Sequence, residues 1–324
     1  MRIVVTGGAG FIGSCFVRTV LAGEHPGLAG AEVVVLDAFT YAGRIENLDP
    51  VRDDPRLRVE RGDVRDPRRV AEVVGDGGVD LVVHFAAETH VDRSITGAAD
   101  FVTTNVVGTQ VLLQAALDGG VGRFVHVSTD EVYGSIDSGS WPEEHPLEPN
   151  SPYSAAKAGS DLLARSYHRT HGLDVVVTRC SNNYGPHQFP EKVIPLFVTR
   201  LLDGGRVPLY GDGRNVRDWL HVTDHCRGVA LAATKGRAGE VYNIGGGTEL
   251  TNRELTTRLL AAVGAGEDRV EHVPDRKGHD RRYSVDWSKI RDELGYTPQV
   301  AFDEGLAGTV AWYREHRDWW EGLR

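Results

Sequence analysis

The sequence predicts an α/β protein built on a doubly wound parallel sheet. Short apolar runs, most of them rich in valine, alternate with helical patterns through the first half of the chain. Such runs suit strands that are buried on both faces, and their alternation with helices predicts βαβ units. The stretch 101–117 has a helical pattern that stops at Gly119 and Gly120. The expected strands are residues 3–5, 33–36, 81–85, 124–127 and 175–177.

The second half of the chain differs in composition and pattern. Proline and glycine interrupt the sequence frequently from about residue 179 onward, and residues 241–244 again have the pattern of a strand. We therefore expect two domains. Residues 1–180, with returning segments near 218–245, would form the doubly wound sheet, and residues 181–324 would form a smaller mixed α/β domain.

Bulk properties exclude several functional classes. The formal net charge of −10 argues against a general nucleic-acid binder. No apolar run approaches the roughly 20 residues that a membrane span needs, and the N-terminus enters a strand without the features of a signal peptide. The spacing of Cys15, Cys180 and Cys226 does not suggest a disulfide framework, so we expect partly buried thiols in a reducing compartment. Together these features predict a cytoplasmic protein.

A glycine-rich loop follows the first expected strand. Gly8, Gly10 and Gly13 match G-x-G-x-x-G, while Gly7, Gly10 and Gly13 match the variant G-x-x-G-x-x-G. Either spacing lets the chain turn sharply, brings backbone N–H groups to a pyrophosphate and points a helix N-terminus at its charge. Because a strand precedes the loop and an apolar helical stretch follows it, the motif predicts a Rossmann dinucleotide-binding domain rather than a turn without a ligand.

Two acidic residues follow later strands. Asp37 closes the second strand, where a carboxylate binds a ribose 2′-OH and repels a 2′-phosphate. This position predicts NAD rather than NADP as the cofactor; the alternative is that Asp37 only starts the next turn. Asp63 is expected at the end of the third strand, either as a carboxylate near the adenine or as a turn residue.

Tyr153 and Lys157 stand at positions i and i+4, so they share one face of a helix that starts near Ser151 and Pro152. A phenol with a pKa of about 10 is a poor base at neutral pH, and a nearby ammonium lowers that pKa. Lys157 and a nicotinamide cation in a dry cleft would supply the charge. Following a Rossmann half, the pair predicts a catalytic base and its activator rather than two surface residues.

The expected strand at 124–127 runs on into Thr129, Asp130 and Glu131. Doubly wound sheets place ligands at the carboxyl ends of their strands, and adjacent acids there can serve as general acid and general base. The alternative is a solvated acidic turn. Tyr133 lies in the same segment but lacks a lysine at i+4, so we do not expect it to be the base.

These motifs together resemble the extended short-chain dehydrogenase/reductase superfamily and, within it, the dTDP-glucose 4,6-dehydratases. Tyr153 and Lys157 mark only the superfamily, whereas the Thr-Asp-Glu triplet at 129–131 marks the dehydratases. Related epimerases and decarboxylases keep the Tyr/Lys pair but lack the Asp-Glu pair. The resemblance spans nearly the whole chain through residues 6–13, 85–94, 128–134, 153–157, 180–186, 208–213, 215–219 and 278–283.

The resemblance implies the members of two binding sites. Arg217, Arg276 and Lys192 suit a diphosphate because they are cations, and Tyr210 offers a ring face to a base. Lys277 stands where the family tends to have proline, which leaves the nucleotide preference open. With the loop glycines, the NAD site would contain Gly7, Gly10, Phe11, Ile12, Gly13, Asp37, Thr40, Asp63, Val64, Ala86, Ala87, Thr104, Tyr153, Lys157 and Asn183. The sugar-nucleotide site would contain Thr89, Asn182, Lys192, Val193, Pro208, Tyr210, Arg217, Asn252, Arg276 and His279.

The resemblance also implies a mechanism for a nucleoside-diphospho-glucose, dTDP-glucose before UDP-glucose. Tyr153 removes the proton of the sugar 4-OH while NAD takes the C4 hydride, and Thr129 hydrogen-bonds the developing 4-keto oxygen. Glu131 then removes the C5 proton, Asp130 protonates the departing 6-OH, and the hydride returns to C6. NAD is regenerated in each turnover. A homodimer is expected through the helices at 101–117 and 153–171.

Two rival functions fit the cofactor motif. Another NAD-dependent nucleotide-sugar enzyme, such as a 4-epimerase or a decarboxylase, is disfavoured by Asp130 and Glu131. A non-catalytic NAD-binding regulator is disfavoured because such proteins often lose the Tyr/Lys pair that this chain keeps.

Two further patterns have structural explanations. His221 and His225 have the spacing of a helical metal pair, but their segment matches the family's strand-to-helix connection, so we expect no metal. Trp319 and Trp320 are expected to anchor the C-terminus by packing rather than to bind a ligand.

Overall fold

The computed structural model describes residues 1–75, 77–275 and 278–323, so the expected substrate residue Arg276 and its neighbour Lys277 lie outside the described residues. The strands are β1 (Arg2–Thr6), β2 (Glu32–Asp37), β3 (Leu57–Arg61), β4 (Leu81–His84), β5 (Arg123–Thr129), β6 (Val175–Cys180), β7 (Asn182–Tyr184), β8 (Val207–Tyr210), β9 (Val216–His221), β10 (Val241–Ile244), β11 (Glu249–Thr251) and β12 (Val270–Val273). The α-helices are α1 (Phe11–Leu21), α2 (Pro67–Val74), α3 (Val91–Thr96), α4 (Ala99–Phe101), α5 (Gly108–Asp118), α6 (Pro152–His171), α7 (Val193–Leu202), α8 (Val222–Lys235), α9 (Asn252–Val263), α10 (Ser288–Leu294), α11 (Phe302–Glu315) and α12 (Arg317–Trp320). Tighter or wider helical turns are η1 (Pro26–Leu28), η2 (Ile45–Val51), the π-helical η3 (Val102–Val107), η4 (Asp130–Tyr133), η5 (Glu267–Arg269) and η6 (Glu321–Leu323).

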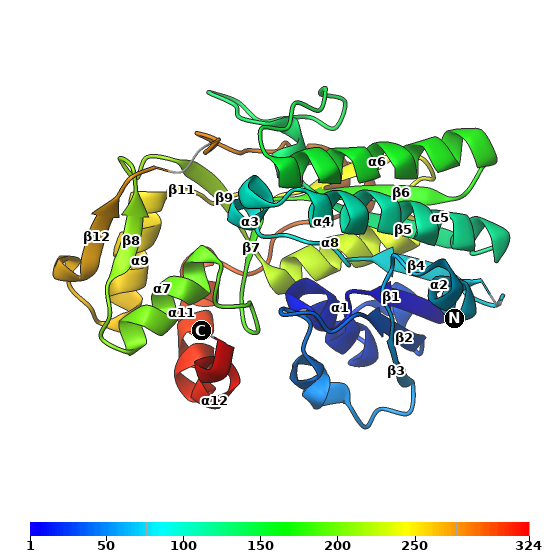
Figure 1. The fold of residues 1–324 in the computed structure, drawn as a ribbon, viewed down its shortest axis with the longest axis horizontal. Helices are drawn as coiled ribbons and strands as arrows, with labels where there is room; N and C mark the ends of the chain where they lie inside the picture. Colours follow the sequence, from blue (N-terminus) through cyan, green and yellow to red (C-terminus); the bar gives the residue numbers. More distant parts are fainter. Residues whose placement is uncertain (76, 276–277, 324) are drawn as a thin grey trace.

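Seven parallel strands form the main sheet, in the order β10-β6-β5-β4-β1-β2-β3. The chain moves outward in one direction from β1 to β3 and in the other from β4 to β10, so the order reverses between β1 and β4 (Figure 1). The predicted doubly wound α/β fold is therefore confirmed. Ligands bind such sheets beyond the carboxyl ends of the strands, at the point where the order reverses.

Helices cover both faces of this sheet because successive strand residues point to opposite sides. In β1, Ile3 and Val5 pack into a core with α1 and α8, while Val4 packs into a second core with α2, α5 and α6. β2 repeats the alternation, with Val33 and Val35 on the first side. The valine-rich runs of β1 and β2 thus face an apolar core on each side of the sheet.

Among the element boundaries that differ from those expected, two concern the cavity. β3 ends at Arg61, so Asp63 lies two residues beyond the strand instead of ending it; its Oδ1 accepts the Arg65 amide in a tight turn, which takes the chain away from the sheet. The helix expected at 101–117 begins earlier, at Ala99, and contains the π-helical η3. Such wide turns inside helices often occur at functional sites.

The second half of the chain contributes both to the main sheet and to a smaller unit. β10 pairs with β6, which returns this half to the main sheet, and α8 packs against α1. A three-stranded sheet β11-β9-β7 and a two-stranded sheet β12-β8 form the smaller unit, with a core built from α7, α9 and α11 (Figure 1). The expected boundary near residue 180 between a cofactor domain and a substrate domain stays a prediction.

The patterns assigned structural roles lie in packed positions. Trp320 is fully buried in the core of the smaller unit, and the indole of Trp319 donates to Asn47 Oδ1 at 3.0 Å, which confirms the packing anchor. Cys15, Cys180 and Cys226 are buried free thiols. In the part of the chain that the structure describes, no helix has the length and apolar character needed to span a membrane.

Candidate active site

The glycine loop forms the turn between β1 and α1. Gly7 has a φ of 67°, and a Cβ there would come within 2.7 Å of the Ala86 backbone beyond β4. A Cβ at Gly13 would overlap the carbonyl of Gly7. The loop can therefore lie this close to β4 only with glycine at these positions. α1 begins after Gly10 with no side-chain cap and no acidic residue in its first turn, so its N-terminal amides suit an anion.

Asp37 ends β2 beside this loop. Its Oδ2 accepts the Ala9 amide at 2.9 Å, and its Oδ1 accepts the Phe39 amide at 2.8 Å. Burial raises the pKa of the Asp37 carboxyl, while these two amide hydrogen bonds lower it. Asp37 therefore holds the turn after β2 as well as lining the cavity, so the two interpretations of this residue are compatible.

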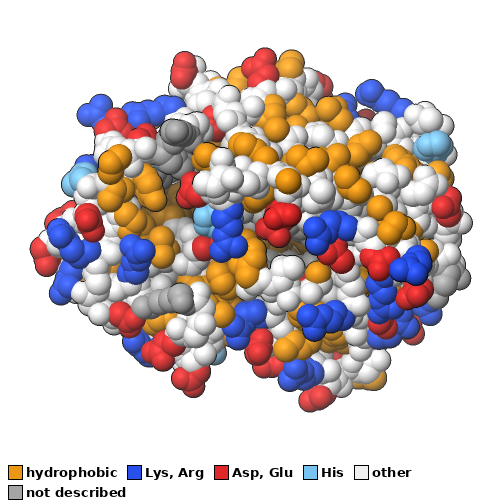
Figure 2. All heavy atoms as spheres, viewed as in Figure 1, with side chains coloured by type: hydrophobic (Ala, Val, Ile, Leu, Met, Phe, Trp, Pro, Cys, Tyr) orange, Lys and Arg blue, Asp and Glu red, His pale blue; other side chains and the backbone are white. Residues whose placement is uncertain are grey.

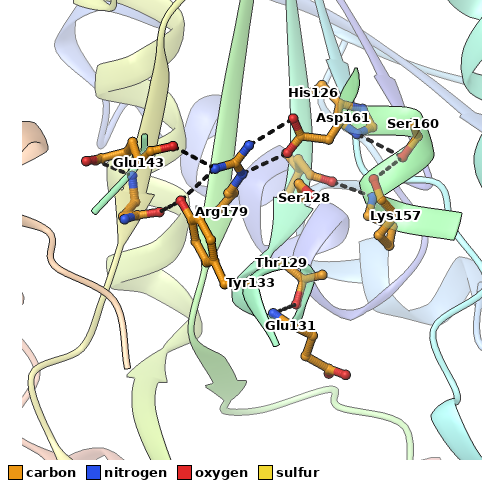
Figure 3. Close-up of polar contacts among 12 residues, drawn as sticks. His126, Ser128, Thr129, Glu131, Tyr133, Glu143, Lys157, Ser160, Asp161 and Arg179 are labelled. Atoms are coloured by element: carbon orange, nitrogen blue, oxygen red, sulfur yellow. Dashed lines mark hydrogen bonds and ion pairs between the residues drawn. The ribbon is translucent and has the colours of Figure 1, made fainter. Parts of the chain in front are cut away.

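The acidic triplet begins at the carboxyl end of β5. Thr129 caps η4, and its Oγ1 accepts the Glu131 amide at 3.3 Å (Figure 3). Asp130 is only 3% exposed. Burial, Glu131 and Asp218 raise the pKa of Asp130 well above its usual value, against the opposing charge of Arg217. Asp130 is thus suited to hold a proton at neutral pH and to act as an acid, which excludes a solvated turn.

The Tyr/Lys pair lies on α6, which starts where the sequence predicts. Ser151 caps the helix in a reciprocal pair with Ser154. The Lys157 ammonium donates to the Val127 carbonyl at 2.7 Å, and burial lowers the pKa of Lys157 to about 8. Burial and the charge of Glu131 raise the pKa of Tyr153 well above its usual value, with a hydrogen bond to Thr129 opposing them. The expected lowering of the Tyr153 pKa is therefore not produced by the protein groups.

A buried polar network supports both catalytic segments. The guanidinium of Arg179 on β6 binds Asp161 at 2.8 Å, one helical turn beyond Lys157, and both side chains are fully buried. The same guanidinium donates to the Tyr133 hydroxyl at 2.6 Å, and Tyr133 donates to Asn243 on β10 at 2.9 Å (Figure 3). Tyr133 thus fastens η4 to the sheet, in agreement with its exclusion as the base.

A cavity of about 470 Å³ brings the predicted cofactor and catalytic residues together. It lies at the carboxyl ends of the central strands, where the strand order reverses. Its lining includes every predicted NAD residue: Gly7, Gly10, Phe11, Ile12, Gly13, Asp37, Thr40, Asp63, Val64, Ala86, Ala87, Thr104, Tyr153, Lys157 and Asn183. It also includes the predicted catalytic residues Thr129, Asp130 and Glu131.

The predicted substrate residues divide into two groups. Thr89, Asn182 and Lys192 line the same cavity, and the Lys192 ammonium donates to the Thr89 carbonyl at 2.7 Å. Arg217 is buried, and its guanidinium carbon lies 4.1 Å from the centre of the Tyr283 ring. Its charge lowers the pKa of Asp130, so Arg217 lies near the acid. The residues that do not line the cavity are Val193, Pro208, Tyr210, Arg217, Asn252 and His279.

Sequence reasoning missed several residues near the cavity mouth. Glu191 accepts a hydrogen bond from Tyr41 at 3.1 Å and pairs with Arg93 at 3.2 Å, and the Arg93 guanidinium lies 4.1 Å from the Tyr41 ring. This cluster joins α3 to two loops that are distant from it in sequence, so no local spacing indicates it. Tyr283, whose ring contacts Arg217, was also missed. Its place in the segment 278–283, which carries the resemblance, could have indicated it.

The histidine pair has a structural role. His221 ends β9 and caps α8, accepting the Thr223 amide at 3.4 Å, and His225 lies inside α8 beside Asn183 at 3.0 Å. This arrangement is the expected strand-to-helix connection. Among the described residues, no group of three or more His, Cys, Asp or Glu side chains is arranged to hold a metal ion.

Comparison with known proteins places the chain among sugar-nucleotide enzymes. The family model for GDP-mannose 4,6 dehydratase matches residues 4–309. The chain belongs to this family. It is 63% identical over 324 residues to dTDP-glucose 4,6-dehydratase of Streptomyces niveus, covering 100% of this chain and 96% of that protein.

Two solved structures are similar to this chain over almost its whole length. The dTDP-glucose 4,6-dehydratase DesIV of Streptomyces venezuelae, solved with NAD bound, has a TM-score of 0.98 and 67% identity, covering 100% of both chains. The UDP-glucose 4-epimerase of Thermus thermophilus, also with NAD, has a TM-score of 0.89 and 33% identity, covering 98% of this chain and 100% of that one. The fold is thus shared with epimerases, and the chemistry must be assigned from the site.

Proposed function

We propose that this protein is an NAD-dependent dTDP-glucose 4,6-dehydratase. The observation that carries the proposal is the triplet Thr129, Asp130 and Glu131 in one cavity with Tyr153 and the glycine loop. An elimination of water needs an acid and a base in addition to the redox base, and this cavity holds both. The relatives of 63% and 67% identity bear the same activity in their names.

The residues of the cavity fit NAD. The uncapped N-terminus of α1 suits the pyrophosphate, and Asp37 suits a ribose 2′-OH and would repel a 2′-phosphate. When bound, NAD supplies a hydride acceptor that takes hydrogen from C4 of the sugar and returns it to C6. Titration calorimetry should show NAD binding far more tightly than NADP; equal affinities would contradict this role of Asp37.

The protein's own residues then divide the proton transfers among them. Tyr153 takes the proton of the 4-OH, and Lys157, held by the Val127 carbonyl, supplies positive charge on the same helix face. Glu131 removes the C5 proton, which the 4-keto group has made acidic. Asp130, whose pKa is raised chiefly by burial, donates its proton to the departing 6-oxygen.

The sugar nucleotide would extend from this cavity towards the smaller unit. Lys192 lines the cavity, and Arg217 adjoins Asp130, so both cations lie where a diphosphate next to the reacting sugar would pass. Tyr210 is exposed on β8 and would stack on the base. The remaining predicted contacts are Thr89, Asn182, Val193, Pro208, Asn252, Arg276 and His279.

The best test is product analysis. The purified protein is incubated separately with dTDP-glucose and UDP-glucose, and the products are identified by mass spectrometry and NMR. A 4-keto-6-deoxy sugar nucleotide formed faster from dTDP-glucose is expected. A C4 epimer of unchanged mass would instead establish the epimerase alternative, and the absence of any product would favour a non-catalytic NAD-binding regulator.

We also infer a cytoplasmic homodimer that contacts neither nucleic acid nor membrane. Val102, Val107 and Leu162 are exposed on the adjoining η3 and α6, and Ile95 is exposed on nearby α3. Figure 2 shows hydrophobic side chains gathered over the part of the surface where Figure 1 draws α5 and α6. A helix pair from each subunit would cover them as a four-helix bundle. Leu162→Arg would place a charge in this interface, so the sedimentation coefficient should fall to that of a monomer.

A further inference from the structure

The proposed dehydration leaves a proton imbalance between two residues. Tyr153 gains the proton of the sugar 4-OH, while Asp130 gives a proton to the departing 6-oxygen. The C4 hydride returns at C6 and the C5 proton returns from Glu131, so neither changes the count. After each turnover one proton is therefore in excess at Tyr153 and one is missing at Asp130.

A single hydroxyl is in contact with both residues. Thr129 Oγ1 donates to Asp130 Oδ1 at 3.3 Å, and the Thr129 side chain also forms a hydrogen bond with Tyr153. The Glu131 amide donates to the same Oγ1 at 3.3 Å, which helps to hold the hydroxyl in place (Figure 3). A hydroxyl has one proton and two lone pairs, so Oγ1 can accept from Tyr153 and the amide while it donates to Asp130.

Asp130 has few other sources of a proton. It is almost fully buried, and its Oδ2 has no hydrogen-bond partner among the described residues. The charged groups that act on it are Glu131, Asp218 and Arg217. Glu131 must return its own proton to C5, and the Asp218 carboxylate accepts the amides of residues 246 and 248, both at 2.8 Å. An arginine does not release a proton in proteins.

We propose that Thr129 relays a proton from Tyr153 to Asp130 and so closes the catalytic cycle. The O–H bond of Tyr153 breaks as a new O–H bond forms on Thr129 Oγ1, and the proton that Thr129 held passes to Asp130 Oδ1. No electrons are exchanged and no further reactant is needed. The relay rests on the proposed dehydratase function and gives Thr129 a second role beside its contact with the 4-keto oxygen.

The test compares the first turnover with later ones in Thr129→Val, which keeps the shape of the side chain but removes its hydroxyl. The resting variant still has a protonated Asp130, so its first turnover needs no relay. Later turnovers must wait for a proton from water. In rapid-quench experiments with dTDP-glucose, the steady-state rate should fall about tenfold or more relative to the first-turnover rate of the same variant. In D₂O the steady-state rate should fall further than that of the wild type.

Two matched variants serve as controls. Thr129→Ser keeps the hydroxyl and should restore the wild-type ratio of the two rates. Thr178→Val removes a buried threonine hydroxyl on β6 that has no hydrogen-bond partner among the described residues, and should leave the ratio unchanged.

The outcomes separate the relay from the function on which it rests. If Thr129→Val slows the first and later turnovers by the same factor, Thr129 only contacts the 4-keto oxygen and the relay is wrong. A Thr129→Ser variant that behaves like Thr129→Val would also contradict it. If the wild type forms no 4-keto-6-deoxy product, the dehydratase function itself is wrong, and the relay fails with it.

Discussion

The predicted cofactor residues and the predicted substrate residues are organised differently. Every predicted NAD residue lines one cavity, whereas only Thr89, Asn182 and Lys192 among the described members of the predicted substrate set do so. Most of the first set follows strands of the parallel sheet, whose carboxyl ends meet at one edge. Four members of the second set lie on β8, β9 and α9, outside that sheet: Pro208, Tyr210, Arg217 and Asn252. A regular parallel sheet therefore brings residues from distant segments into one cavity, whereas residues on separate smaller sheets are spread over a wider surface.

The largest effect is expected at the centre of the cofactor region. Tyr153→Phe keeps the ring but removes the phenol, so the first oxidation should be lost and turnover should fall by about 10²–10⁴-fold. Single-turnover absorbance should show no transient NADH, while calorimetry should show that NAD still binds. Near-normal turnover would mean that another group is the base.

The next effect separates oxidation from elimination. Glu131→Gln should still form some 4-keto-glucose nucleotide but should exchange almost no solvent deuterium into C5. Asp130→Asn should accumulate the same intermediate with C5 exchange preserved; both should lower dehydration about 10²-fold or more. Deuterium incorporation is measured by NMR. The opposite exchange pattern would swap the roles of the two carboxyls.

A third prediction compares how much one ion pair beside the main sheet and one ion pair of the smaller unit contribute to the free energy of unfolding. Asp161→Asn would leave the Arg179 charge buried without its carboxylate and should lower the free energy of unfolding by about 3–5 kcal/mol. Glu249→Gln removes the partner of Arg282 in a partly exposed pair of the smaller unit and should cost about 0–1 kcal/mol. Urea unfolding of both variants makes the comparison, and equal losses would contradict the assigned difference in burial.

Arg217 tests whether a residue outside the cavity lining still binds substrate. Arg217→Ala should raise KM for dTDP-glucose about 10- to 100-fold, as expected for a lost charge-assisted hydrogen bond. The kcat should change less, because a diphosphate contact is present in both the ground state and the transition state. An unchanged KM would remove Arg217 from the substrate site.

The smallest effect is a dependence on pH. Burial lowers the pKa of Lys157 to about 8, so its ammonium is charged below that pH and becomes neutral above it. The positive charge that supports Tyr153 is lost as pH rises, and kcat should fall by about tenfold between pH 7 and pH 9. Lys157→Arg should abolish this fall while lowering activity, because arginine stays charged. A flat wild-type profile would mean that the Lys157 charge does not limit the rate.

The sequence by itself determined the fold class and, through the glycine loop, Asp37, Tyr153 and Lys157, a part of the cofactor cavity, while most of its other members were implied by the family resemblance. Valine-rich runs specify strands buried on both faces, and the capped start of α6 places Tyr153 and Lys157 on one helix face. These are short-range properties of the chain, because side-chain alternation and helix caps depend on neighbours a few residues apart. The glycine loop belongs with them, since its turn needs glycine wherever it occurs.

Only the tertiary structure decided the protonation tendencies and the long-range support of the site. The pKa values of Tyr153 and Asp130 are both raised chiefly by burial, and burial depends on segments that are far apart in the sequence. The Arg179 network joins η4, β6, α6 and β10, so no local pattern could have assigned Tyr133 its role. Desolvation and charge act through space, and the chain brings these groups together only when the sheet and its helices have packed.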